Sequence, residues 1–143
     1  MLDIFIASDA AQRDRCYLLR IAVFVRGQGV PMSMELDDHD ETEAIHFLSV
    51  EEGKDVATAR LLIRGDKAKV QRVAVSRTVR GRGHGHTLMQ TVIEHAKSLD
   101  AVRCVVLDSQ LSASEFYAKL GFVAEGDPFD DAGIAHICMR LAL

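Results

Sequence analysis

Three alternating glycines interleaved with arginine and histidine form the segment of this chain best suited to chemistry, Arg80-Gly81-Arg82-Gly83-His84-Gly85-His86. Glycines at every second position let the backbone turn tightly and leave its N–H groups uncovered. An apolar pattern of helical spacing follows from Leu88, so the segment leads into a helix start, where the dipole attracts anions. Because Arg80 and Arg82 add positive charge, the segment predicts a site for a phosphate or pyrophosphate.

Two common phosphate-binding loops do not match this segment. The third glycine comes one residue too early for the dinucleotide pattern G-x-G-x-x-G, and no Gly-Lys-Ser/Thr closes the run as in a P-loop. His84 and His86 could be read as a metal pair, but two alternating histidines between glycines are more typical of backbone amide donors. We therefore expect phosphate binding through the main chain and no metal.

The phosphate segment lies between a predicted β-branched strand, Val70–Val75, and a helix with one apolar face. Apolar residues recur there at three- and four-residue steps: Leu88, Met89, Val92, Ile93, Ala96 and Leu99. Outside this unit, helical and strand patterns with turn residues between them predict eight further elements. These are a strand over 2–7, a helix capped by Asp9 and ended by Gly27, strands over 45–51 and 55–64, a strand over 102–107, a helix over 113–120 ended by Gly121, and last strands at 122–123 and 134–143. The order predicts an α/β sandwich with a mixed sheet.

The length and composition fit one compact domain over residues 1–143. Hydrophobic residues make up 48% of the 143 residues and charged residues 27%, which is typical of a folded globular chain. The net charge of -4 argues against nonspecific nucleic-acid binding. No apolar run is as long as a membrane span and no export signal begins the chain, so we expect a cytoplasmic protein without membrane association.

The three cysteines, Cys16, Cys104 and Cys138, are widely spaced and form no zinc or C-x-x-C pattern. Each lies among apolar residues, so the sequence predicts three buried thiols.

The most acidic part of the chain lies between Pro31 and Ile45. It could hold Ca²⁺ or Mg²⁺ at Asp37-Asp38-His39-Asp40, although the EF-hand spacing is absent. It could instead form a negative wall that attracts a cationic amine, with Glu35 or one of the aspartates taking a proton from that amine. A hydrated loop with surface ion pairs is the third interpretation.

Three motifs together resemble the GNAT (GCN5-related N-acetyltransferase) family. Arg80-x-x-Gly83-x-Gly85, after the strand Val73-Ala74-Val75, resembles the pyrophosphate loop with which that family binds coenzyme A. Phe116-Tyr117-x-x-x-Gly121-Phe122 resembles a second family segment, and Gln110-x-x-Ala113 precedes it, with Gln where Asn is commoner.

The amino-terminal half is similar to the ElaA/YjcF-like branch of that family. The matching residues are Val23-Phe24-Val25, Gln28, Val30-Pro31, Glu35-x-Asp37-x-x-Asp40 and His46-Phe47, joined near the other end by Gly133-Ile134-x-His136. Gly27 and Ala135 depart from the branch, which usually has Glu and Pro there.

The resemblance implies a mixed, mostly antiparallel central sheet flanked by helices, with a splayed strand pair binding acetyl-CoA. It implies an N-acetyltransferase that transfers the acetyl group directly to a primary amine of a small molecule or peptide, and it makes a homodimer a reasonable expectation. The pantetheine arm would pair with the backbone of Val73, Ala74 and Val75. The pyrophosphate would bind from Arg80 to His86, with Gln110 as a further cofactor contact.

The resemblance also suggests catalytic roles. Tyr117 is the candidate general acid that protonates the departing thiolate, whereas in the alternative interpretation it only fills the core. Glu35, His46 or His136 could be the base, and Arg72, His46 and His136 are candidates to contact the acceptor. Arg72 could instead pair with the acidic loop. A CoA-binding or regulatory module without acceptor chemistry is the alternative function, and nucleic-acid binding by the arginine-glycine loop is a third.

Overall fold

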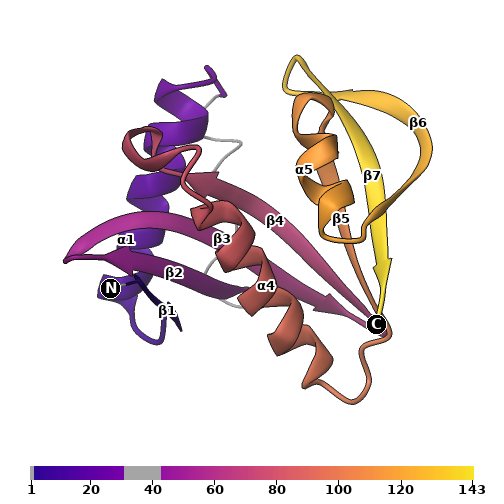
Figure 1. The fold of residues 1–143 in the computed structure, drawn as a ribbon, viewed down its shortest axis with the longest axis horizontal. Helices are drawn as coiled ribbons and strands as arrows, with labels where there is room; N and C mark the ends of the chain where they lie inside the picture. The colour runs from indigo at the N-terminus through magenta and orange to yellow at the C-terminus, as the bar shows by residue number, and fades with distance from the viewer. Residues whose placement is uncertain (1, 31–42) are drawn as a thin grey trace.

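The computed structural model describes residues 2–30 and 43–143 and contains a seven-stranded sheet in the order β1-β2-β3-β4-β5-β7-β6 (Figure 1). The strands are β1 (Leu2–Ile6), β2 (Ile45–Glu51), β3 (Lys54–Arg64), β4 (Lys67–Val75), β5 (Cys104–Gln110), β6 (Val123–Asp131) and β7 (Ile134–Ala142). The helical segments are α1 (Ala10–Arg20), η1 (Ile21–Arg26), η2 (Arg77–Val79), α4 (His84–Lys97), η3 (Leu111–Ala113) and α5 (Ser114–Lys119).

The sheet is antiparallel except between β4 and β5. These two strands run parallel because α4 carries the chain back between them, as a parallel pair requires. The predicted mixed, mostly antiparallel sheet flanked by helices is therefore confirmed.

Helix α1 begins where the sequence predicted it. The Asp9 carboxylate accepts a hydrogen bond of 2.8 Å from the Gln12 amide, which satisfies one of the free N–H groups of the first turn. The helix continues into the π-helical segment η1 and ends before Gly27, also as predicted. Helix α1 packs on one face of the sheet, where Cys16, Ala7 and Leu48 form a small buried cluster.

Helices α4 and α5 cover the opposite face, in front of the sheet in Figure 1. The predicted apolar stripe of α4 is confirmed from Leu88 to Ala96, all of whose stripe residues are buried in the main core. Leu99 lies past the end of the helix and packs against this core only in part. The core joins the stripe to inward side chains of β3, β4 and β5 and to Tyr117 and Phe122.

Two expectations need correction at the carboxyl-terminal end. Strand β6 runs to Asp131, well past the predicted residues 122–123, and all of its side chains are exposed, so no apolar alternation marked it in the sequence. Cys138 is only half-buried, whereas Cys16 and Cys104 are buried as predicted. Cys138 pairs with Asp108 on the sheet face that α4 and α5 leave uncovered.

We expect Leu88→Ala to lower the free energy of unfolding by about 3 kcal/mol, because it removes a fully buried side chain and leaves a cavity. Leu18→Ala, in a helix position that is 67% exposed, is the matched control and should change it by less than about 0.5 kcal/mol. Urea unfolding followed by circular dichroism measures both. Equal losses would contradict the burial described here.

Candidate active site

Strands β4 and β5 separate part-way along their length. Their parallel pairing runs from Lys67 opposite Cys104 to Val70 opposite Leu107 and then stops. Beyond that point β4 stays paired with β3 as far as Val75, and β5 stays paired with β7 as far as Gln110. The sheet therefore opens between two strands that are each held firmly on their outer side.

A bulge in β4 accompanies this opening. Arg72 has a φ of 54°, which is unusual for a residue with a side chain, and the pairing of β4 with β3 shifts register at this point, between Thr58 and Arg60. A bulge bends a strand and increases its local twist. Residues Val73–Val75 are thereby directed away from β5.

A pocket of about 560 Å³ occupies the opening. Its walls come from η1 and the turn after it, from β4, β5 and α5, and from the β6–β7 hairpin. The lining residues include Phe24, Gln28, Lys69, Arg72, Val73, Val75, Arg80, Asp108, Gln110, Tyr117 and His136. The structure thus brings together seven site residues predicted from the sequence: Tyr117, Arg72, Val73, Val75, Arg80, Gln110 and His136.

The glycine segment forms the start of α4. Gly83 is the N-cap residue with a φ of 83°, and the first intrahelical hydrogen bond joins the Thr87 amide to its carbonyl oxygen at 3.1 Å. The amides of residues 84–86 precede this bond, so they point out of the helix end. A Cβ on Gly83 would meet no atom within 4 Å, so the left-handed backbone, and not crowding, accounts for glycine there.

Gly85 is small for a different reason. A Cβ at this position would lie 3.3 Å from both the Phe116 ring and the Val75 side chain. Glycine therefore lets the first turn of α4 approach β4 and α5 closely, which places the helix end beside the pocket.

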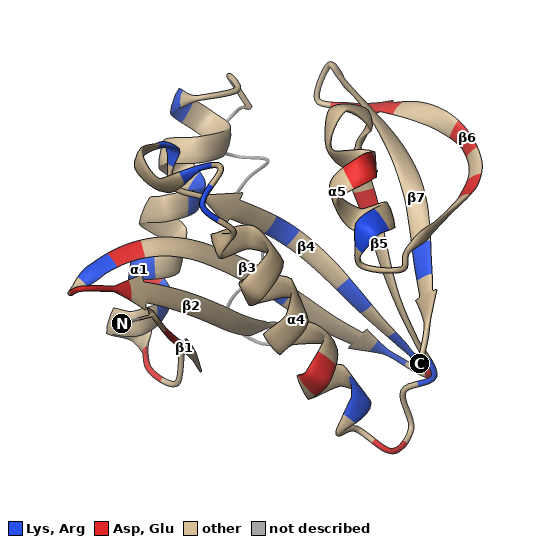
Figure 2. Cartoon of the chain, in the orientation of Figure 1, with Lys and Arg blue, Asp and Glu red and all other residues tan. Residues whose placement is uncertain are grey.

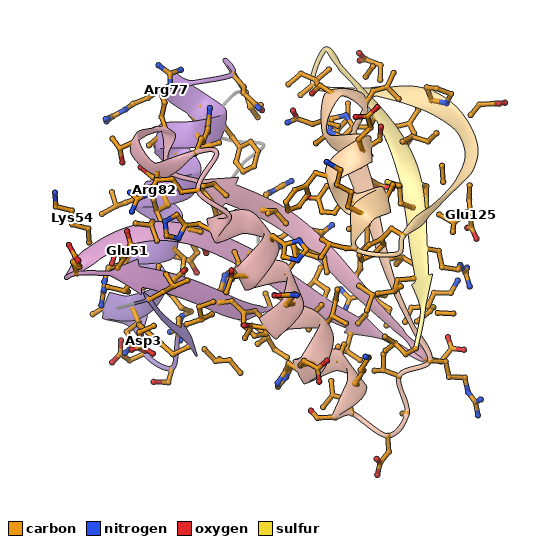
Figure 3. All side chains as sticks on the ribbon, in the orientation of Figure 1. Asp3, Glu51, Lys54, Arg77, Arg82 and Glu125 are labelled. Carbon is orange, nitrogen blue, oxygen red and sulfur yellow. The ribbon has the colours of Figure 1, made fainter. Side chains whose placement is uncertain are left out.

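The two arginines of the segment have different surroundings. Arg80 lines the pocket, and its Nε donates a hydrogen bond of 3.2 Å to the carbonyl oxygen of Val75. Arg82 pairs with Glu51 at 2.9 Å, and Figure 3 shows the two side by side. Arg80 thus joins the end of β4 to the glycine segment, while Arg82 ties that segment to β2.

The imidazole of His84 is 5% exposed, with Nε2 3.5 Å from a Glu51 oxygen. Several residues that the sequence assigned to the cofactor site are not among the described lining residues of the pocket. These are Ala74, Gly81, Arg82, Gly83, His84, Gly85 and His86. The amides of His84 and His86 therefore remain their predicted contribution. Within residues 2–30 and 43–143, no group of three His, Cys, Asp or Glu side chains could hold a metal ion.

Tyr117 reaches the pocket from α5 and is only 8% exposed. Its ring makes edge-to-face contacts with Phe116 and Phe122, at centroid distances of 4.9 Å and 5.9 Å. Burial raises the pKa of the phenol to about 12, because the charged form would be poorly solvated. The side chain therefore belongs to the core and to the pocket, and its oxygen keeps a proton throughout the neutral range.

A pair of amides connects the two sides of the opening. Gln28, after η1, and Gln110, at the end of β5, donate to each other through hydrogen bonds of 3.2 Å and 2.8 Å. Gln110 was predicted as a cofactor contact, whereas Gln28 was noted only as one of the residues that carry the family resemblance. No local pattern indicated that these two amides meet, since 82 residues separate them.

The predicted acceptor residues have different positions. His136 lines the pocket, with its Nδ1 2.7 Å from the Ile134 carbonyl oxygen and its ring stacked on Phe129. His46 does not line the described pocket, because its ring is buried against Tyr17, 5.5 Å away between centroids. The predicted base Glu35 and the sequence Asp37-Asp38-His39-Asp40 lie outside the described residues.

Sequence reasoning did not single out Lys69 and Asp108, which also line the pocket. Strand alternation could have indicated Asp108, because it places this residue on the same sheet face as the predicted site residue Gln110.

The comparisons with known proteins agree with this geometry. Residues 20–143 match the family model described as an acetyltransferase (GNAT) domain. The chain belongs to the GNAT acetyltransferase family. Members of this family are acyltransferases that use CoA derivatives and act on amine acceptors, and the resemblance noted in the sequence is confirmed.

Individual relatives cover nearly the whole chain. The N-acetyltransferase YjcF of Bacillus subtilis is 31% identical over 135 residues, which is 94% of this chain and 95% of that protein. Escherichia coli ElaA is 28% identical, with a TM-score of 0.89 over 98% of this chain and 99% of its own. An acyl-CoA N-acyltransferase from Pseudomonas aeruginosa is 29% identical, with a TM-score of 0.87 and the same coverage.

None of the helices in the described residues is long and apolar enough to span a membrane.

The buried phenol makes a prediction for alkaline pH. An unfolded tyrosine has a pKa of about 10, so the unfolded chain loses this proton at lower pH than the folded chain. The stability gained by burying the neutral phenol is complete below pH 10 and is lost as the pH rises toward 12. Between pH 9 and pH 11, the wild-type chain should lose on the order of 1 kcal/mol more stability than Tyr117→Phe. Denaturant unfolding at both pH values tests this, and parallel losses in the two proteins would contradict it.

Proposed function

We propose that this chain is an acetyl-CoA-dependent N-acetyltransferase that acetylates a primary amine of a small molecule or peptide. One observation carries the proposal: β4 and β5 separate directly beside the glycine-rich start of α4, and Tyr117 lies in the opening. An extended thioester substrate with a pyrophosphate at one end fits this arrangement. The P. aeruginosa relative, whose name specifies acyl-CoA and an N-acyl product, supports it.

The proposed cofactor site uses the main chain more than side chains. Beyond the last β4–β5 pair, the inner edge of Val73–Val75 offers backbone groups that can pair with an extended pantetheine arm, as an added strand would. The amides at the start of α4 and the guanidinium of Arg80 provide the positive field for the pyrophosphate. Gln110 lines the pocket at the end of β5, where it can contact the arm.

In the proposed reaction, the amine nitrogen forms a bond to the acetyl carbonyl carbon and the carbon–sulfur bond breaks. The electron pair of that bond stays on sulfur, which takes the proton of the Tyr117 hydroxyl. A phenol with a raised pKa is fully protonated beforehand and is a weak acid, so its proton moves when the thiolate charge develops and solvent restores it afterwards. The amine nitrogen gives up one proton to a base, for which Glu35 remains our proposal.

We propose that Arg72 and His136 contact the acceptor, because both line the pocket. His46 is not part of this proposal, because its ring is buried away from the described pocket.

Gly83→Asp should weaken CoA binding by at least about 100-fold, because it places a carboxylate where the helix amides and Arg80 attract a pyrophosphate. Gly53→Asp is a matched control: Gly53 also has a positive φ, of 77°, and open space around it, but it lies in the β2–β3 turn. Calorimetric titration with CoA should show near wild-type binding for this control. Equal binding by both variants would remove the glycine segment from the site.

Tyr117→Phe should bind acetyl-CoA normally and lower kcat for thiol release by about 100-fold, the usual effect of losing a general acid. Tyr17→Phe, which removes a hydroxyl outside the pocket, serves as the control. The assay measures released CoA thiol with a panel of primary amines. Normal turnover by Tyr117→Phe would exclude the tyrosine as the acid, and acetyl-CoA binding without release from any amine would favour a CoA-binding module.

A further inference from the structure

An ion pair lies where β4 and β5 separate. Lys69 Nζ is 3.5 Å from Asp108 Oδ2, and both residues line the pocket. Asp108 is the first residue of β5 beyond the last pair with β4, and Lys69 immediately precedes the last paired residue of β4. The two side chains are 36% and 38% exposed, so a molecule in the pocket can reach both charges.

The pair lies on the side of the sheet away from α4 and α5. Val70 and Leu107, the adjacent residues in each strand, point into the core beneath α4. Because side chains alternate along a strand, Lys69 and Asp108 point to the opposite face. Gln110 and its partner in register, His136, share that face. Figure 2 shows Lys and Arg along β4 and the acidic residues of β6 further across the sheet.

Structural stabilisation accounts poorly for this pair. An ion pair with both partners about one-third exposed contributes little to the stability of the fold. Neighbouring arginines on the face have partners of their own: Arg140 lies 3.0 Å from Glu125, and Arg60 donates to Gln71 at 2.6 Å. Lys69 and Asp108 instead present a positive and a negative group side by side to the pocket.

We propose that Lys69 and Asp108 recognise the acceptor, and that the acceptor is a primary amine that also carries a carboxylate, as an amino acid does. The inference rests on the proposed function and specifies its substrate class. The ammonium group would pair with Asp108 and the carboxylate with Lys69, so two intermolecular ion pairs replace one internal pair. Charge remains balanced before and after binding.

Other amines fit this pair less well. An amine without a carboxylate would satisfy Asp108 but would bring its ammonium close to the ammonium of Lys69. Two like charges this close near a protein surface repel each other. A polyamine would add further positive charge to the same region. The arrangement therefore selects amines with an adjacent anion.

Matched substrates and variants test this inference. The substrates are the common amino acids and their α-amides, which keep the amine and side chain but lack the carboxylate. The variants are Lys69→Gln and Asp108→Asn. Their controls are Lys67→Gln and Asp127→Asn, which remove the same charges from β4 and β6 at positions outside the lining of the pocket. Calorimetry with acetyl-CoA comes first, followed by thiol release at saturating acetyl-CoA.

We expect the wild-type chain and both controls to prefer at least one amino acid over its amide by about tenfold or more in kcat/KM. Lys69→Gln should reduce this preference at least about tenfold, through the KM of the acid, whereas Asp108→Asn should raise the KM of acid and amide alike. If the pair had a merely structural role, both variants would lower kcat/KM equally for the acid and for the amide, and that result would overturn the inference.

The outcomes also separate this inference from the proposed function. Turnover of amides equal to or faster than that of the acids, with acetyl-CoA binding intact, leaves the N-acetyltransferase in place and overturns the substrate class. Failure to bind acetyl-CoA, or thiol release from no acid and no amide, refutes the proposed function together with this inference.

Discussion

The site depends on the loss of hydrogen bonding between β4 and β5 beyond Val70 and Leu107. A sheet normally satisfies the backbone of an inner strand from both sides, and groups left unpaired away from water are costly. Here both strands keep their outer ladders, so the inner edges stay fixed in an extended conformation that leaves room for a further extended segment between them. The bulge at Arg72 allows this, because it turns the end of β4 aside without breaking its pairing with β3.

The two faces of the sheet contribute different kinds of side chain to the opening. On one face, α4 and α5 form an apolar layer that holds Tyr117 between Phe116 and Phe122. On the other, Lys69, Asp108 and His136 remain exposed to the pocket. Apolar packing fixes the phenol and raises its pKa, while partial solvation keeps the polar face able to exchange partners.

Periodicity and turn chemistry predicted most of the fold, including the Asp9 cap, the α4 stripe and the helix end at Gly121. They could not predict the extent of β6, which has no buried side chain, or the bulge at Arg72, where an ordinary residue adopts a positive φ. The motifs predicted Tyr117, Arg80 and Gln110 as site residues, and all three line the pocket. The contacts of Lys69 with Asp108 and of Gln28 with Gln110 come from tertiary pairing between distant segments, which local patterns do not encode.

The exposed strand β6 limits how this sheet can associate with other chains. As the last strand in the order, it presents one unpaired backbone edge, which is the usual template for adding a strand from a neighbour. Its sequence counters this with Asp127, Pro128 and Asp130, and its register with β7 shifts between Glu125 and Phe129. Proline lacks the donor that a new ladder needs, and the acidic side chains of two copies would repel. The β6 edge of the sheet, beside the pocket, is thus protected from edge-to-edge growth.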